Sequence, residues 1–317
     1  MLDNELKNVK NICIIGHINP DGDCIGSALS IYNYIISNYN DKFVTFYSKN
    51  YNEKFSFLSG FNKINEKDNE QIVYDLAICV DCASSDRLGD FLDYYNNAKR
   101  KIIFDHHETN NLSSDNSIIM PKMTSTAEVI YNDLDKQKIN KQVAECIYTG
   151  LIHDTGVFRY PSVTKETFEC AAFLISFGIN SSKIIEDSYY SVSLNQQKIT
   201  AEVILNSKLV FDNKIIYSTL TNEQMKKYNL DKKDIDGIIA QLRQTRGIIG
   251  AFFIYQSGPD EFKVSMRSKT EAFNVSKLAQ KFGGGGHIMA SGCTIKSATP
   301  DIFYMFEEDI TKMLNSI

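Results

Sequence analysis

Acidic and histidine side chains follow four short apolar runs of this chain, and they are the residues best suited to chemistry. They are His17, Asp21, Asp23, Asp81, Asp105, His106, His107 and Asp154. Three of the apolar runs, residues 12–15, 76–80 and 102–104, have the composition of buried strands. A single acid after a strand is usually a turn or cap residue. Four segments that end in the same residue types instead favour one shared site.

Six of these side chains form a candidate metal-ligand set. The set is His17, Asp21, Asp23, Asp81, His106 and Asp154. Carboxylates and imidazoles without a thiolate suit Mn²⁺ or Mg²⁺ better than a structural zinc ion. Six ligands exceed what one catalytic ion with open positions requires. They therefore predict two ions that share a bridging carboxylate, an arrangement suited to phosphoryl transfer.

A second candidate site lies near the end of the chain, where the glycine run Gly283–Gly286 precedes a histidine. Glycine lets the backbone approach a phosphate closely, and successive N–H groups can point at the anion. A helix stop would explain the first glycine alone. An arginine at the end of a predicted strand could grip a phosphate through two N–H groups, although it could also be an ordinary surface residue. The candidate substrate-binding residues are Arg267, Gly284, Gly285, Gly286 and His287.

The elements that must position the first site alternate between strand and helix from residue 11 to residue 158. The predicted strands are 11–15, 43–47, 75–80 and 101–105, and the predicted helices include 23–37, 125–137 and 141–153. Thr124 or Ser125 would cap the second of these helices. Such alternation predicts a parallel sheet with helices on both faces. Ligands of these sheets bind at the carboxyl ends of the strands, where the acids and histidines lie.

The fold class predicted for the whole chain is α/β, with two domains joined by helix. The pattern is helical from residue 164 and changes at Lys208 to short strands and hairpins. We expect an N-terminal parallel-sheet domain at 1–185, a helical connector at 186–206 and a smaller C-terminal α+β domain at 207–317. A length of 317 residues suits two domains.

The composition is that of an ordinary globular protein, with 43% hydrophobic residues, 23% charged residues and a net charge of −5. Negative charge argues against binding of long duplex DNA, but a short nucleotide could still bind in a metal-loaded cleft. The N-terminal segment lacks the apolar core of a signal peptide, and no apolar run reaches the length of a membrane span. Seven cysteines without zinc-site spacing predict buried thiols in a reducing compartment. We therefore expect a cytoplasmic protein that does not bind membranes.

Five segments resemble the motifs of one known family. Residues 17–27, 81–89 and 150–158 resemble the first, second and fourth motifs of the DHH phosphoesterases. The sequence Asp-His-His at residues 105–107 is the motif that names this family. Residues 283–292 resemble the signature of the DHH-associated domain. The motifs occur in the family's order, and the resemblance covers nearly the whole chain.

The resemblance implies a division of the ligands between two ions. His17 and Asp21 would hold one ion, and Asp81 would bridge it to the other. The second ion would be held by Asp23, His106 and Asp154. The expected cofactor is two Mn²⁺ ions, with Mg²⁺ or Co²⁺ as substitutes.

The resemblance also implies three catalytic residues. Asp81 would hold both ions and position the attacking hydroxide. Asp105 would orient a ligand imidazole without binding an ion itself. His107 would face the scissile phosphate and help the leaving oxygen to depart.

Within the family, the chain resembles the nanoRNA ribonuclease and pAp phosphatase subfamily, and also the stand-alone cyclic-dinucleotide phosphodiesterases. The resemblance implies a hydrolase that cleaves short oligoribonucleotides to mononucleotides and pAp to AMP. A phosphodiesterase for cyclic di-AMP or pApA is the alternative. An inorganic pyrophosphatase would lack the glycine-rich histidine segment, and a non-catalytic nucleotide-binding module would be expected to have lost metal ligands. The preferred substrate, the direction of attack, the native metal and a homodimeric state stay open.

Overall fold

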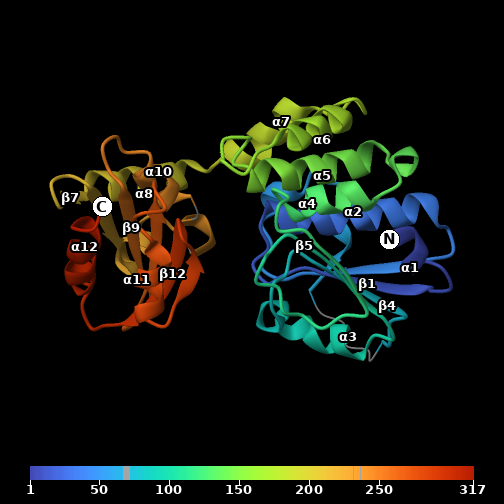
Figure 1. Ribbon diagram of the computed structural model, residues 1–317, viewed down its shortest axis with the longest axis horizontal. Coiled ribbons are helices and arrows are strands. Elements are labelled where there is room, and N and C mark those ends of the chain that lie inside the picture. Colours follow the sequence, from blue (N-terminus) through green and yellow to red (C-terminus); the bar gives the residue numbers. More distant parts are fainter. Residues whose placement is uncertain (67–71, 231, 236) are drawn as a thin grey trace. The chain divides into compact units, whose positions relative to one another are not determined.

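The computed structural model describes residues 1–66, 72–230, 232–235 and 237–317. The chain divides into two compact units, Met1–Ser191 and Val192–Ile317, which Figure 1 shows from blue to yellow-green and from yellow to red. Each unit is built on its own six-stranded sheet. No helix among these residues combines the length and apolar composition that a bilayer crossing requires.

The sheet of the first unit is parallel throughout, which confirms the prediction for the N-terminal domain. Its strands are β1 (Asn11–Ile15), β2 (Phe43–Tyr47), β3 (Ile64–Asn65), β4 (Leu76–Val80), β5 (Lys101–Asp105) and β6 (Asn116–Ile119). The strand order is β3-β2-β1-β4-β5-β6, and every neighbouring pair is parallel. The order reverses between β1 and β4. Parallel sheets bind ligands at such a reversal, beyond the carboxyl ends of the strands.

Helices cover both faces of this sheet (Figure 1). One face carries α2 (Gly22–Asn38), α4 (Thr126–Asp133) and α5 (Lys141–Asp154), and the other carries η3 (Ser85–Phe91) and α3 (Leu92–Asn97). The side chains of β1 alternate between the two cores, because successive residues of a strand point to opposite faces. Ile12 and Ile14 pack in the first core, and Cys13 and Ile15 pack in the second.

The described part of the first unit contains further helices. They are α1 (Leu2–Glu5), η1 (Glu53–Phe55), η2 (Phe61–Lys63), η4 (Lys136–Lys138), α6 (Lys165–Ile175), α7 (Ser181–Ile185) and η5 (Glu186–Tyr190). The N-cap of α4 is Ser125, whose hydroxyl accepts from the N–H of Glu128 at 3.1 Å. This confirms one of the two caps that the sequence allowed.

Two glycines let α2 and α5 approach closely beside the sheet. A Cβ on Gly26 of α2 would lie 2.5 Å from the carbonyl oxygen of Cys146 on α5. A Cβ on Gly150 of α5 would lie 2.7 Å from Oδ1 of Asp23. Both distances are shorter than van der Waals contact, so larger residues would push the helices apart. The close packing therefore brings the start of α2 next to the end of α5.

The sheet of the second unit is mixed, as expected for an α+β domain. Its order is β11-β12-β10-β9-β8-β7; β8 and β9 are parallel and the other neighbours antiparallel. The strands are β7 (Lys208–Val210), β8 (Ile215–Leu220), β9 (Gly250–Gly258), β10 (Glu261–Ser268), β11 (Gly285–His287) and β12 (Ala290–Lys296). The helices are α8 (Leu194–Leu205), α9 (Asn222–Lys227), η6 (Lys232–Ile235), α10 (Ile238–Arg243), α11 (Val275–Lys281), η7 (Phe303–Phe306) and α12 (Glu307–Leu314). α8 and α10 share one apolar core with β8 and β9, and α11, η7 and α12 share a second core with the sheet.

The segment predicted as a connector, residues 186–206, is divided between the two units. η5 belongs to the first unit, whereas α8 belongs to the second. Ile199 and Val203 on α8 are buried in the core that lies against β8 and β9. The division of the chain after Ser191 follows from this packing, because α8 buries its apolar side chains on the second sheet.

Candidate metal centre

Three adjacent strands of the first sheet deliver the central residues of the site. His17 lies two residues beyond β1, Asp81 directly follows β4, and Asp105 is the last residue of β5. Asp81 has a positive φ of 55°, which is uncommon for a residue other than glycine. Its N–H still donates to the carbonyl of Phe104 at 3.0 Å. The backbone therefore holds Asp81 in a left-handed conformation at the sheet edge, of the kind often found at functional sites.

Three imidazoles surround the carboxylate of Asp81, which is 4% exposed. His17 Nε2 lies 3.6 Å from Oδ2, and His106 Nε2 and His107 Nδ1 each lie 3.8 Å from Oδ1. Burial alone would raise the pKa of Asp81, but the neighbouring His17, followed by the charges of His106 and His107, lowers it overall. The carboxylate therefore stays ionised in the middle of the cluster, the place where a bridging ligand is needed.

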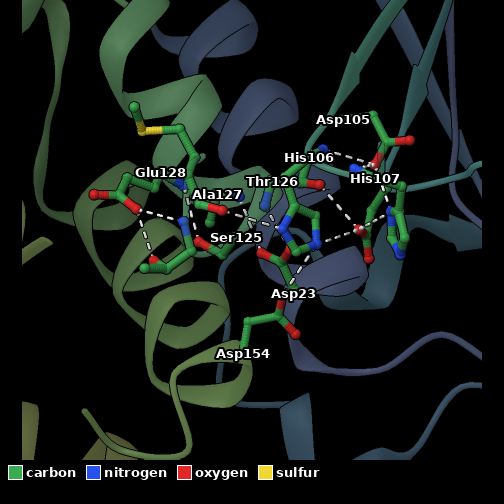
Figure 2. A network of polar contacts seen from close by, with 12 residues as sticks. Asp23, Asp105, His106, His107, Ser125, Thr126, Ala127, Glu128 and Asp154 are labelled. Atoms are coloured by element: carbon green, nitrogen blue, oxygen red, sulfur yellow. Dashed lines mark hydrogen bonds and ion pairs between the residues drawn. The ribbon is translucent and has the colours of Figure 1, made fainter. Parts of the chain in front are cut away.

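A second group of ligand atoms comes from Asp23, His106 and Asp154, and these atoms lie within 4.8 Å of one another. His106 Nε2 is 3.1 Å from Oδ2 of Asp154. Asp23 is fully buried and accepts from the N–H groups of Thr126 at 2.7 Å and Ala127 at 3.0 Å. Figure 2 shows Asp23 between the start of α4 and the ring of His106, with Asp154 beyond it.

The charges of this second group favour the binding of a cation. Burial, followed by the charges of Asp81 and Asp154, raises the pKa of Asp23 well above its usual value. Burial and the charge of Asp81 also raise the pKa of Asp154, although the hydrogen bond from His106 opposes the rise. Burial lowers the pKa of His106, but Asp154 and the neighbouring acids outweigh this effect and raise it to about 10. Carboxylates that lie this close together, with Asp23 fully buried, fit a divalent cation, since a cation would compensate their repulsion.

A third group of ligand atoms is formed by His17, Cys24 and Asp81, again within 4.8 Å of one another. Nδ1 of His17 donates to the carbonyl of Ile18 at 2.9 Å, which leaves Nε2 toward Asp81. Burial disfavours charge on His17, but Cys24 and Asp81 raise its pKa to about 12. Cys24 is absent from the sequence-predicted ligand set, because its position beside His17 depends on how α2 begins.

Asp21 has a structural task that the ligand prediction did not include. Its Oδ1 accepts from the N–H groups of Asp23 at 3.0 Å and Cys24 at 3.1 Å, so it is the N-cap of α2. Among the described residues, it belongs to none of the three close groups of ligand atoms. The structure thus brings His17, Asp23, Asp81, His106 and Asp154 into the close groups and places Asp21 at the edge.

Asp105 orients the ring of His107. Its Oδ1 accepts from Nδ1 of His107 at 2.7 Å and from the N–H of His106 at 2.8 Å, and Figure 2 shows both contacts. Asn110 donates to the other oxygen. The prediction assigned Asp105 to a ligand imidazole; in the structure, the ring it holds is the one predicted to face the substrate. The hydrogen bond that His107 donates to Asp105 raises the pKa of His107 against the effect of burial.

The candidate substrate residues of the second unit lie on neighbouring strands. Arg267 on β10 is opposite Ala290 on β12, and Ala290 is in turn opposite His287 on β11. Residues directly opposite one another in antiparallel strands point to the same face. The small side chain of Ala290 therefore separates an arginine and a histidine on one face. Lys263, four residues before Arg267, shares this face, because every second residue of a strand does so.

The glycine run is an edge strand of the second sheet. Gly283 has a φ of 70° and follows Phe282, the C-cap of α11, as a helix stop would. Gly285 and Gly286 belong to β11, which forms a hairpin with β12. A turn and then β12 follow His287. Gly284 lines a shallow pocket with Tyr255 and Lys263, among others.

Both units match known domain families. A model of the DHH family, N-terminal domain, matches residues 11–151, and a model of the DHHA1 domain matches residues 212–317. This chain is a DHH-family protein. The family predicted from the motifs is thus confirmed for both parts of the chain.

Relatives of this DHH protein match over nearly its whole length. It is 29% identical to a protein of Streptococcus mutans named "Probable bifunctional oligoribonuclease and PAP phosphatase NrnA", covering 99% of this chain and 96% of that one. It is 28% identical to "Bifunctional oligoribonuclease and PAP phosphatase NrnA" of Bacillus subtilis, covering 89% and 88%. A crystal structure of an exopolyphosphatase-related protein from Bacteroides fragilis is similar with a TM-score of 0.90 at 28% identity, covering 98% and 94%. The NrnA matches confirm the predicted subfamily.

Two residues of this DHH site were missed by motif-based reasoning. The hydroxyl of Thr126 donates to Oδ1 of Asp81 at 2.9 Å, and the thiol of Cys24 lies in the group of His17. The sequence holds a partial signal for Thr126, since helix caps favour Ser and Thr and the start of this helix was predicted. It holds no comparable signal for Cys24.

Proposed function

We propose that this DHH protein is a phosphoesterase that hydrolyses short oligoribonucleotides to mononucleotides and pAp to AMP. The observation that carries the proposal is the convergence of His17, His106 and His107 on the buried carboxylate of Asp81. The names of the NrnA relatives, which match along nearly the full chain, supply the substrate class.

The ligand groups suit two divalent cations. We assign His17 and Asp21 to one ion, with Asp81 as the shared carboxylate. The second ion would be held by Asp23, His106 and Asp154. The donors are chiefly carboxylate oxygens and imidazole nitrogens, so Mn²⁺ is our choice of ion. Bound ions would supply the positive charge that polarises a phosphoryl group.

The side chains around the ligands have definable tasks. Asp105 holds Nδ1 of His107, so Nε2 is the ring atom left to meet a substrate. The His107 side chain is 31% exposed, whereas Asp105 is fully buried. We assign to Nε2 of His107 the donation of a proton to the leaving oxygen, a task suited to an imidazole kept protonated by a carboxylate. Thr126 fixes the orientation of Asp81.

The second unit would bind a phosphate other than the one that reacts. Arg267 and His287 lie on one face of the sheet, on either side of Ala290. Arginine can form charge-assisted hydrogen bonds with two phosphate oxygens. The backbone N–H groups of the glycine run would add neutral donors. A substrate with two phosphates would thus be preferred over one with a single phosphate.

A substrate panel tests this function. Purified protein with Mn²⁺ would be supplied with RNA of two to five nucleotides, a long single-stranded RNA, pAp, pApA, cyclic di-AMP and pyrophosphate, and the products would be separated. We expect mononucleotides from the short RNAs at rates far above those on long RNA, and AMP from pAp. Hydrolysis of pyrophosphate alone would contradict the proposal. Efficient turnover of cyclic di-AMP with inert short RNA would replace it with the cyclic-dinucleotide alternative.

A further inference from the structure

Cys24 gives the centre a sulfur atom in a set otherwise made of oxygen and nitrogen. Its Sγ, a ring nitrogen of His17 and a carboxylate oxygen of Asp81 lie within 4.8 Å of one another. Cys24 is fully buried, and the other two residues are each 4% exposed. Three donors of this kind have the spacing of ligands around one ion.

Local features of the backbone hold the thiol of Cys24 beside the ring of His17. Gly16 leaves room for it, since a Cβ on Gly16 would lie 2.4 Å from Sγ. The backbone of Cys24 is fixed at the first turn of α2, where its N–H donates to Asp21 at 3.1 Å. The ring of His17 is fixed by its bond to the carbonyl of Ile18. The thiol and the imidazole are therefore held next to each other by the backbone around them.

We propose that Cys24 is a further ligand of the cation at the position that His17 and Asp81 define, and that its sulfur raises the affinity of this position for zinc-class cations. The S–H bond would break as the ion binds, the sulfur would keep the electron pair and donate it to the cation, and the proton would leave to solvent. A coordinated thiol is deprotonated even where burial would keep the free thiol protonated. This inference rests on the proposed assignment of His17 and Asp81 to one metal position.

The thiolate makes the two metal positions chemically different. Sulfur ligands favour Zn²⁺ and related ions, whereas carboxylates suit Mn²⁺ and Mg²⁺. The group of Asp23, His106 and Asp154 contains no sulfur. The position beside His17 therefore binds zinc-class ions more tightly than the other position does.

The other thiol beside Asp81 serves no such purpose. The Sγ of Cys82 donates to the carbonyl of Ser84 at 3.3 Å, and it belongs to none of the groups of ligand atoms among the described residues. Cys170 on α6 is a matched control, because it is also buried in a helix of the first unit and also lies outside these groups.

Cobalt titration of the metal-free full-length protein tests the proposal, because thiolate coordination to Co²⁺ produces a charge-transfer band in the near ultraviolet. Wild type and Cys170→Ala should show the band, and Cys24→Ala should lose it. Zn²⁺ affinity, measured by competition with a chelating indicator, should fall at least about tenfold in Cys24→Ala, and Mn²⁺ affinity should change less. With both metal positions filled, the wild type should also release one more proton per protein molecule than Cys24→Ala.

Absence of the band in wild-type protein that binds cobalt would overturn the proposal without the use of any variant. An equally strong band in Cys24→Ala would overturn it as well. These results would leave the proposed function intact if Mn²⁺ still binds and short RNA is still cleaved. Failure to bind either Co²⁺ or Mn²⁺ would instead contradict the assignment of a metal centre, on which both proposals depend.

Discussion

The hydroxyl of Thr126 donates a 2.9 Å hydrogen bond to Oδ1 of Asp81. The backbone N–H of the same residue donates to Asp23 at 2.7 Å. One residue at the start of α4 thus fixes two carboxylates that come from different parts of the chain. The first turn of α4 thus supports the proposed metal centre, because free N–H groups at a helix start are good donors to carboxylates.

Replacement of Thr126 by valine should weaken metal binding without unfolding the protein. Valine keeps the shape of the side chain and the backbone N–H to Asp23 but removes the hydroxyl that orients Asp81. Loss of a residue that orients a ligand typically reduces metal affinity by about 10- to 100-fold. Calorimetric titration with Mn²⁺ would measure this change. Thr126→Ser, which keeps the hydroxyl, should bind like the wild type, and equal affinities in all three proteins would refute the orienting role.

Gly284 and Gly285 should respond differently to alanine. A Cβ on Gly284 would lie 2.2 Å from the carbonyl oxygen of Gly292, whereas a Cβ on Gly285 would meet no atom within 4 Å. Gly284→Ala should lower the free energy of unfolding by about 1–3 kcal/mol through overpacking. Gly285→Ala should change it by less than about 0.5 kcal/mol. Urea unfolding of both variants checks the difference.

The same pair separates structure from substrate binding. If the backbone of Gly285 approaches a phosphate, Gly285→Ala should raise the KM for pAp while the stability stays the same. An unchanged KM would mean that this glycine has no part in binding.

Arg267→Ala and His287→Ala should impair only substrates that carry a second phosphate. Each variant loses a charge-assisted contact worth about 1.5–3 kcal/mol, which corresponds to roughly 10- to 150-fold in kcat/KM. The loss is expected for pAp and short RNA but not for a small chromogenic phosphodiester. Bound manganese should be unchanged, because both residues lie in the second unit. Equal losses on both kinds of substrate would point to misfolding instead.

Asp75 should make a pH-dependent contribution to the stability of the first unit. Its carboxylate accepts from Lys99 Nζ at 2.8 Å and from the N–H groups of Lys10 and Asn11 at 3.0 Å. The ion pair with Lys99, followed by the two N–H groups, lowers the pKa of Asp75 from its usual 3.8. The folded state therefore binds fewer protons than the unfolded state, so this contribution is complete above about pH 4 and is lost as the pH falls further.

Asp75→Asn provides the measurement for this prediction. The difference in unfolding free energy between wild type and variant should be larger at pH 6 than at pH 3, because protonated aspartate and asparagine are alike in charge. Unfolding by urea at pH 6 and at pH 3 gives the free energy of unfolding of both proteins at each pH. A difference that does not depend on pH would show that the charge of Asp75 has no effect on stability.

Local patterns in the sequence were sufficient to predict an element where it is a continuous apolar run. β1, β4 and β5 are buried apolar runs, and the residues that follow them, including Asp81 and His106, could be placed at one sheet edge from the alternation alone. β6 and β11 escaped prediction because they are partly or wholly exposed, and β11 is made largely of glycine. Edge strands of this kind lack the alternation of apolar side chains on which prediction depends.

The contacts of Cys24 and Asp105 could not be predicted from local patterns in the sequence. Cys24 reaches His17 only because Gly16 leaves space and α2 begins at a fixed place. Asp105 could have oriented either of the two rings beside it, and the local backbone decides in favour of His107. Both outcomes depend on tertiary geometry of about an ångström, which residue types and spacing do not contain.

The most direct test of the account is the rate at which wild-type protein and Asp81→Asn hydrolyse a two-nucleotide RNA with Mn²⁺. Asparagine tolerates the positive φ at this position and can still accept from Thr126, so the fold should survive. We predict that the variant loses at least about a hundredfold in kcat, the loss expected when one charged group of a catalytic set is removed. Turnover by Asp81→Asn close to that of the wild type would contradict the assignment of this carboxylate to the centre of the metal site.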